Sequence, residues 1–176
     1  MNFDLQTATA LLIRTPATMK ALLRGLPPSL TQTNEGKDTW DPRTVVAHLI
    51  HTDRINWVPR AKWLLEFGES RVFPPPANNN PREDPLEHLL DEFTDVRAEK
   101  LAELHALHLT GQDLARRGLH PKFGSVTLSQ LLATWAAHDL THLHQISRIL
   151  AHQFKESVGP WTEFLGVMHC NGHSSF

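Results

Sequence analysis

Apolar side chains recur every three or four positions through four long stretches of the chain, which is the spacing of helices with one buried face. The first stretch covers about residues 8–24. It is followed by Gly25 and two prolines, a combination that commonly ends a helix. Pro16 lies inside the stretch and is expected to bend or restart the helix. The pattern therefore predicts one helix near the beginning of the chain.

A second helix is predicted to begin at Asp41-Pro42, because aspartate caps helices and proline suits the first helical position. It continues through VVAHLIHTDRINW and AKWLLEF, with a possible kink at Pro59. A third amphipathic helix is predicted over residues 85–107. Residues 69–84 between them are rich in proline and asparagine, which favours an ordered surface loop.

The longest helix is predicted from about residue 127 to residue 155. Thr127 and Gln130 have the spacing of a capping box at its start. A short final helix is expected over residues 161–169. No segment alternates between apolar and polar positions for long enough to predict a strand, and residues 111–125 are expected to form a loop.

Four principal helices predict an all-α fold, a four-helix bundle, formed by residues 1–176 as a single domain. A chain of 176 residues can bury a substantial core without disulfides. The single cysteine, Cys170, excludes an internal disulfide, which fits a reducing cytoplasm. The N-terminus has no signal-peptide pattern, so a cytoplasmic protein is expected.

Charge and hydropathy exclude several classes of partner. The formal net charge is -2 and charges of both signs are interspersed, so neither nucleic acid nor an anionic membrane surface is expected to bind. No stretch approaches the ~20 apolar residues that span a bilayer. The unusual feature of the composition is 12 histidines in a chain without tyrosine.

The segment WAAHDLTHLHQI places histidines at 138, 142 and 144 within an otherwise apolar helix. A helix advances about 100° per residue, so His138 and His142 lie about 40° apart and one turn from each other. Their imidazoles could reach one ion at the usual zinc–nitrogen distance of about 2.0–2.1 Å. His144 should face elsewhere. A pair at this spacing also occurs by chance, so packed histidines without a metal are the alternative.

A third ligand would have to come from another helix, and His48 in VVAHLI is the best candidate because it lies on the apolar side. His51 is its competitor, but the polar residues that follow it favour an approach to solvent. Three neutral imidazoles would leave positions open for water or substrate, as in catalytic zinc sites. HDLTH also resembles the HExxH motif of zinc proteases, but aspartate is shorter than the glutamate base, so a protease is disfavoured.

The chain resembles the DinB-like superfamily, also known as the DinB/YfiT-like metalloenzymes. The resemblance rests on RTPATMKALLRGLP, on NEGKDTWDPRTVVAHLIHTDRINWVPRAKWLLEFGESR, on HPKFGSVTLSQLLATWAAHDLTHLHQISRILA and on VGPW, which together cover nearly the whole chain. It implies a bundle with up-down-down-up topology. It also implies a metal triad of one histidine on the second helix and two on the last long helix, which match His48, His138 and His142.

Some members of this superfamily are S-transferases or isomerases that use bacillithiol, mycothiol or glutathione. The resemblance therefore implies a divalent metal, Zn²⁺ or Ni²⁺, a low-molecular-weight thiol and a small-molecule substrate. A metal-dependent transferase is the leading expectation, with a non-catalytic, stress-associated metal-binding homodimer as the alternative and a hydrolase as a third reading. Asp139 follows the first histidine of the pair, where the family often has glutamate. It is expected to tune the surroundings of the ligands or to cap a neighbouring helix.

Overall fold

A computed structural model of the chain describes residues 3–75 and 82–169. Part of the loop predicted over residues 69–84, and Cys170, therefore lie outside the described residues. Five helices build the body of the molecule: α1 (Leu5–Leu23), α3 (Pro42–Ile55), α4 (Trp57–Phe67), α5 (Leu86–Ala106) and α7 (Leu128–His152). Shorter helical segments occur at α2 (Pro28–Thr31), η1 (Gly68–Ser70), α6 (Gly111–Ala115), α8 (Lys155–Val158), η2 (Gly159–Phe164) and η3 (Gly166–Met168).

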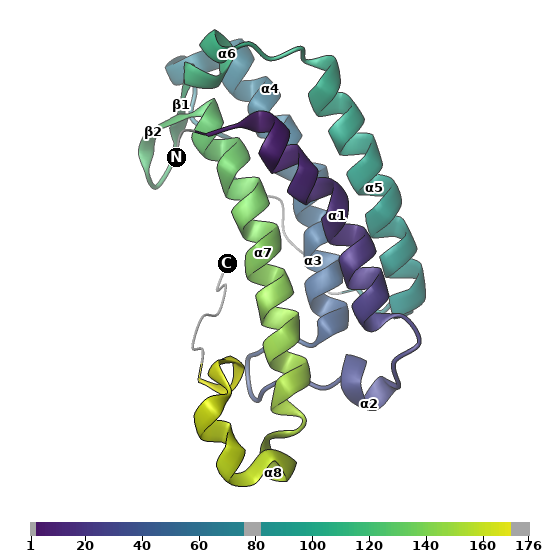
Figure 1. Cartoon of the computed structure of the whole chain (residues 1–176). Helices are drawn as coiled ribbons and strands as arrows, with labels where there is room; N and C mark the ends of the chain where they lie inside the picture. Colours follow the sequence, from purple (N-terminus) through teal and green to yellow (C-terminus); the bar gives the residue numbers. More distant parts are fainter. Residues whose placement is uncertain (1–2, 76–81, 170–176) are drawn as a thin grey trace.

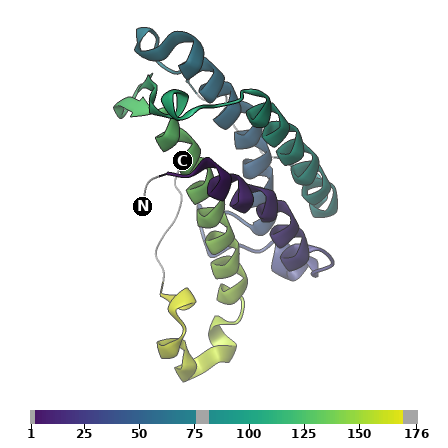
Figure 2. The same ribbon diagram turned by 45° about the horizontal axis from the view of Figure 1, so that its top comes forward.

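The long helices form a four-helix bundle with up-down-down-up topology, in which α3 and α4 together count as one member (Figure 1). Helices α1 and α7 run in one direction, whereas α3–α4 and α5 run in the other (Figures 1 and 2). Helix α1 packs against α5 and α7, and α3 packs against the same two helices. The predicted all-α bundle is confirmed, and the long connection before α5 is what allows α3 and α5 to lie parallel.

Two apolar clusters make up the core, one around Trp135 and Leu64 and the other around Phe93 and Ile146. A layer of buried polar side chains separates them along α1, α3, α5 and α7. These side chains belong to Thr15, His48, Thr52, Asp53, Arg97, Asp139, His142 and Gln145. Buried polar groups destabilise a fold unless they find partners, so this layer is where a specific function is to be sought.

The second predicted helix is divided into α3 and α4, which meet at Asn56. Pro59 explains the position of the break, because it has no N–H for the carbonyl of Ile55 and its ring would collide with that carbonyl. The kink predicted at Pro59 therefore appears one turn earlier, as an interruption. Helix α1, in contrast, continues through Pro16 without a break.

The expectation that residues 111–125 contain no regular structure is wrong. This segment contains α6, strand β1 (Arg117–His120) and the start of strand β2 (Gly124–Thr127). The two strands pair antiparallel, with Gly118 opposite Val126. A Cβ atom at Gly118 would lie 2.9 Å from the Leu64 side chain, so close packing against α4 requires glycine there. Strands of four residues are too short to be recognised by alternation.

At the C-terminal end, α7 stops at His152 instead of residue 155, and the predicted final helix consists of the 3₁₀ turns η2 and η3. Within the part of the chain that the structure describes, no helix is both long enough and apolar enough to cross a bilayer.

Candidate metal centre

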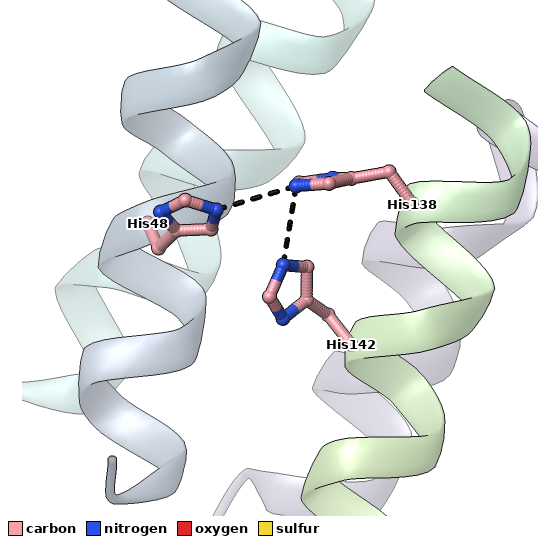
Figure 3. A group of neighbouring side chains, drawn as sticks. All are labelled: His48, His138 and His142. Carbon is pink, nitrogen blue, oxygen red and sulfur yellow. Dashed lines mark hydrogen bonds between the residues drawn. The ribbon is translucent and has the colours of Figure 1, made fainter. Parts of the chain in front are cut away.

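The three histidines singled out in the sequence converge between α3 and α7 (Figure 3). The Nε2 atom of His138 lies 3.3 Å from Nε2 of His48 and 3.2 Å from Nε2 of His142. The ligand atoms of the three residues all lie within 4.8 Å of one another. Three ring nitrogens on two antiparallel helices therefore face a common point.

These separations suit a divalent ion. Two nitrogens bound to zinc at about 2.1 Å with tetrahedral geometry lie roughly 3.4 Å from each other. The distances from His138 to its two neighbours, 3.3 and 3.2 Å, are close to this value. The three ligand atoms lie within 4.8 Å of one another, so a bound ion would draw His48 and His142 closer together. Without a cation, lone pairs of neutral imidazoles would face each other at hydrogen-bonding distance with too few protons to share. The three histidine nitrogens are therefore suited to bind one metal ion, and they would supply three of its ligands.

The protonation state of the triad also favours metal binding. Burial lowers the pKa of His48 to about 3, and the neighbouring His142 contributes to this shift. Burial likewise lowers the pKa of His138 to about 2. The pKa of His142 is lowered by burial, against the opposing effects of its hydrogen bond to Gln145 and of the Asp139 charge. All three rings are therefore neutral at pH 7, which is the form that binds metal.

Hydrogen bonding fixes the orientation of only one of the rings. His142 Nδ1 lies 2.7 Å from Oε1 of the buried Gln145. Because an amide oxygen only accepts, Nδ1 carries the proton and Nε2 keeps its lone pair for the centre. The Nδ1 atoms of His48 and His138 are buried and have no hydrogen-bond partner.

Indole rings enclose the triad. The Trp40 ring lies 4.8 Å from the ring of His48 and is stacked at 6.1 Å on that of His142. The Trp57 ring meets His138 edge-on, with the centroids 5.1 Å apart. These contacts exclude water from the sides of the site, so its electrostatic interactions are stronger than in solvent.

Next to the triad along α3 and α7 lies a buried ion network centred on Arg97 of α5, which is 1% exposed. Its guanidinium donates hydrogen bonds to both carboxylate oxygens of Asp53 on α3 and to both of Asp139 on α7. Trp135 Nε1 donates a further bond of 3.0 Å to Asp53. Burial raises the pKa of Asp53 to about 6, against the lowering effect of Arg97.

Of the two roles expected for Asp139, tuning the surroundings of the ligands or capping a neighbouring helix, the contacts that the structure describes favour the first. Asp139 pairs with Arg97, and its charge raises the pKa of His142. His144 is exposed, and His51 is half-buried on α3 outside the group of three.

Two residues of the site, Gln145 and Arg97, were not predicted. Gln145 lies one turn after His142 on the same buried face. Arg97 lies four residues after Phe93 in an apolar stripe, which is a detectable signal for a buried charge.

A surface groove of about 570 Å³ has none of the three histidines in its lining. It lies between the β1–β2 hairpin and α7, where it is lined by Phe123, Val126, Thr134 and Ala137 among others. Thr134 precedes His138 by one turn on the same face. The hairpin thus borders a groove that begins one turn from His138 along α7. A larger groove, of about 660 Å³ between α1 and α5, contains none of the three histidines.

Comparisons with known proteins agree with this picture. The family model of the DinB superfamily matches residues 11–146. Among solved structures, the chain is similar to YfiT from Bacillus subtilis, with a TM-score of 0.70 and 22% sequence identity over 85% of this chain and 87% of that one. YfiT is described as "a probable metal-dependent hydrolase with an unusual four-helix bundle topology". No curated protein matches the chain.

Proposed function

The chain belongs to the DinB superfamily, and from this premise we propose that it is a metal-dependent enzyme whose divalent ion is held by His48, His138 and His142. The observation that carries the proposal is the convergence of three neutral imidazoles on one point, those of His48 and His142 buried and that of His138 half-buried. Zn²⁺ and Ni²⁺ are the ions we expect, since imidazole suits both.

A divalent ion held by three nitrogens would act as a Lewis acid, lowering the pKa of a thiol or a water molecule that takes an open position. The chain's own contribution is to hold the three rings neutral and to exclude solvent. Gln145 fixes the tautomer of His142, while Trp40 and Trp57 cover the rings. We expect a small-molecule substrate, and the groove lined by Thr134 and Ala137, one turn before His138 on α7, is a candidate surface for its binding.

We propose S-transfer from a low-molecular-weight thiol as the reaction. A free thiol has a pKa of about 8.5, whereas that of water is about 15.7, so a thiol needs far less acidification. This difference matters here because the two carboxylates of the polar layer, Asp53 and Asp139, are both occupied by Arg97. Neither is free to act as a general base, and a thiol nucleophile needs none.

Hydrolysis is the second candidate, and the description of YfiT as a metal-dependent hydrolase favours it. The same three ligands would activate water in place of a thiol. Under this alternative a base from the substrate or solvent would have to replace the carboxylate that other metallohydrolases supply.

The test compares metal-loaded with chelated protein. Each is incubated with glutathione, mycothiol or bacillithiol and 1-chloro-2,4-dinitrobenzene, and the S-conjugate is measured by absorbance. We expect a conjugate that depends on metal, is lost in His142→Ala and persists in the matched variant His144→Ala. If only p-nitrophenyl esters turn over, the protein is a hydrolase. A loaded protein that turns over neither class of substrate would be a metal-binding protein without catalysis.

We further propose that the protein is a homodimer. Leu11 and Leu22, on one side of α1, are 41% and 38% exposed, and Leu140 on α7 is 47% exposed. A second copy of the chain would cover these apolar side chains. Light scattering after size exclusion should give twice the protomer mass of 19.9 kDa, and a single protomer mass would contradict the proposal.

A further inference from the structure

We propose that Arg97, whose hydrogen bonds go to Asp53, Asp139 and the Leu12 carbonyl, is a positioning residue of the metal centre. This inference rests on the proposed metal site and extends it to a residue outside the ligand set. It begins from the two helices that carry the ligands. Helix α3 holds His48 and Asp53, and α7 holds His138 and Asp139. Arg97 of α5 binds both aspartates, so one guanidinium ties the two ligand-bearing helices together.

The ties are close to the ligands. Asp139 is the residue next to His138, and Asp53 is about 7.5 Å along the α3 axis from His48. Arg97 donates to Asp53 with bonds of 2.7 and 3.1 Å and to Asp139 with bonds of 2.5 and 3.0 Å. A shift of either helix relative to the other would break these bonds and would also change the separation between His48 and His138.

The fifth bond of Arg97 fixes the guanidinium itself. Its Nη1 donates to the carbonyl oxygen of Leu12 on α1 at 2.9 Å. In an uninterrupted helix this carbonyl would accept from the N–H of residue 16, but residue 16 is proline and has no N–H. Pro16 therefore leaves an acceptor available inside the bundle. With it, all five N–H donors of Arg97 are paired, and all four members of the bundle meet at one side chain.

Such an arrangement resists small displacements because the guanidinium is planar and its donors have fixed directions. Trp135 adds to this by holding Asp53 from α7 at 3.0 Å. Lysine would keep the positive charge but would lack the five N–H donors in fixed directions. It could therefore not bind the carboxylates of Asp53 and Asp139 at the same time with two hydrogen bonds each. The chemistry at position 97 therefore sets the distance between the ligand-bearing helices.

The experiment uses the full chain with Arg97→Lys and measures three quantities: the dissociation constants for Co²⁺ and Zn²⁺ by chelator competition, the visible spectrum of bound Co²⁺, and the unfolding midpoint of the metal-free protein. We expect Arg97→Lys to weaken binding about tenfold, as changes beyond the ligands commonly do, and to alter the Co²⁺ bands, which report ligand geometry. Leu104→Ala is the matched control. It removes a buried side chain from the same helix, two turns away, and should lower the midpoint while the spectrum and the dissociation constants stay within roughly twofold.

Asp53→Asn is the second variant, for use if Arg97→Lys does not fold. It keeps the size of the side chain but weakens the tie to α3 alone, so weaker binding with altered Co²⁺ bands is again expected. Unchanged binding and spectrum in the variant that folds would overturn the positioning role, as would the same changes in Leu104→Ala. Absence of Co²⁺ and Zn²⁺ binding by the wild-type protein would instead reject the metal site and this inference with it.

Discussion

Nδ1 of His142 and Oε1 of Gln145 lie 2.7 Å apart on successive turns of α7. Of the three rings in the candidate centre, this is the one whose second nitrogen is tied to another side chain, since the Nδ1 atoms of His48 and His138 have no partner. His142 is therefore held in the tautomer that binds metal before any ion arrives. The other two rings depend on packing for their orientation.

Replacement of Gln145 by leucine should weaken metal binding by about 10–100-fold, because the ring of His142 loses the acceptor that orients it. Gln145→Glu should restore much of the affinity, since a carboxylate also accepts from Nδ1. Chelator competition with Zn²⁺ measures both effects. The exposed Ser147→Ala on the same helix is the control, and equal affinities in the leucine and serine variants would contradict the role of Gln145.

His142→Ala should strip metal from the protein without unfolding it. His144, two residues later, is exposed and outside the triad, so His144→Ala should keep full occupancy. Elemental analysis of protein purified without chelator or a nickel column gives the stoichiometry, and circular dichroism checks the fold. Full occupancy in His142→Ala would reject the ligand assignment.

Binding of a paramagnetic ion should quench the fluorescence of Trp40, whose ring is stacked on His142 at 6.1 Å. Titration of the metal-free protein with Co²⁺ or Ni²⁺ should therefore lower the emission, and Trp40→Phe should show a smaller fractional loss. Trp161 is 70% exposed on the 3₁₀ segment η2, and Trp161→Phe should retain the full response. The idea fails if the two variants respond alike.

The metal-free protein should lose stability on mild acidification. The folded-state pKa values of His48 and His138 are about 3 and about 2, against about 6.5 in an unfolded chain. The unfolded chain therefore takes up protons first as the pH falls below about 6.5, and the stability contributed by the neutral rings is lost from there downward. Asp53 acts in the opposite direction, because its folded pKa is raised to about 6.

The histidines outnumber this aspartate, so we expect the free energy of unfolding to fall by about 2 kcal/mol between pH 7 and pH 5.5. Urea unfolding of chelated protein at both values measures the change. His48→Leu should have a weaker pH dependence than the wild type, whereas His144→Asn should not alter it. A stability that is constant or rises over this interval would contradict the burial of neutral imidazoles.

Periodicity in the sequence was sufficient to predict the long helices and the bundle, because each helix buries one continuous apolar face. It could not predict the β1–β2 hairpin, since Arg117–His120 and Gly124–Thr127 are stabilised by tertiary contacts such as that of Gly118 with Leu64. Periodicity also could not predict that α3 and α4 are divided at Asn56. A proline indicates that a helix is perturbed, but it does not indicate at which residue the helix is interrupted.

The same contrast holds for the site. His138 and His142 could be paired from their spacing on one helix, but the placement of His48 beside them depends on how α3 packs on α7. Arg97 illustrates the limit most clearly. Its position in the apolar stripe of α5 indicates burial, but its partners come from three other helices. The spacing of residues along one helix cannot predict which residues of other helices will contact a given side chain.

The bond between Arg97 and the Leu12 carbonyl has a consequence for biogenesis. A nascent chain lacking its last long helix already contains Pro16, Asp53 and Arg97, yet it has neither Asp139 nor two of the three imidazoles. Helix α7 (Leu128–His152) must therefore dock before the guanidinium has all its partners. Capture of the ion by all three imidazoles should accordingly follow the docking of this helix, so a chain that is still incomplete holds only one of the ligands.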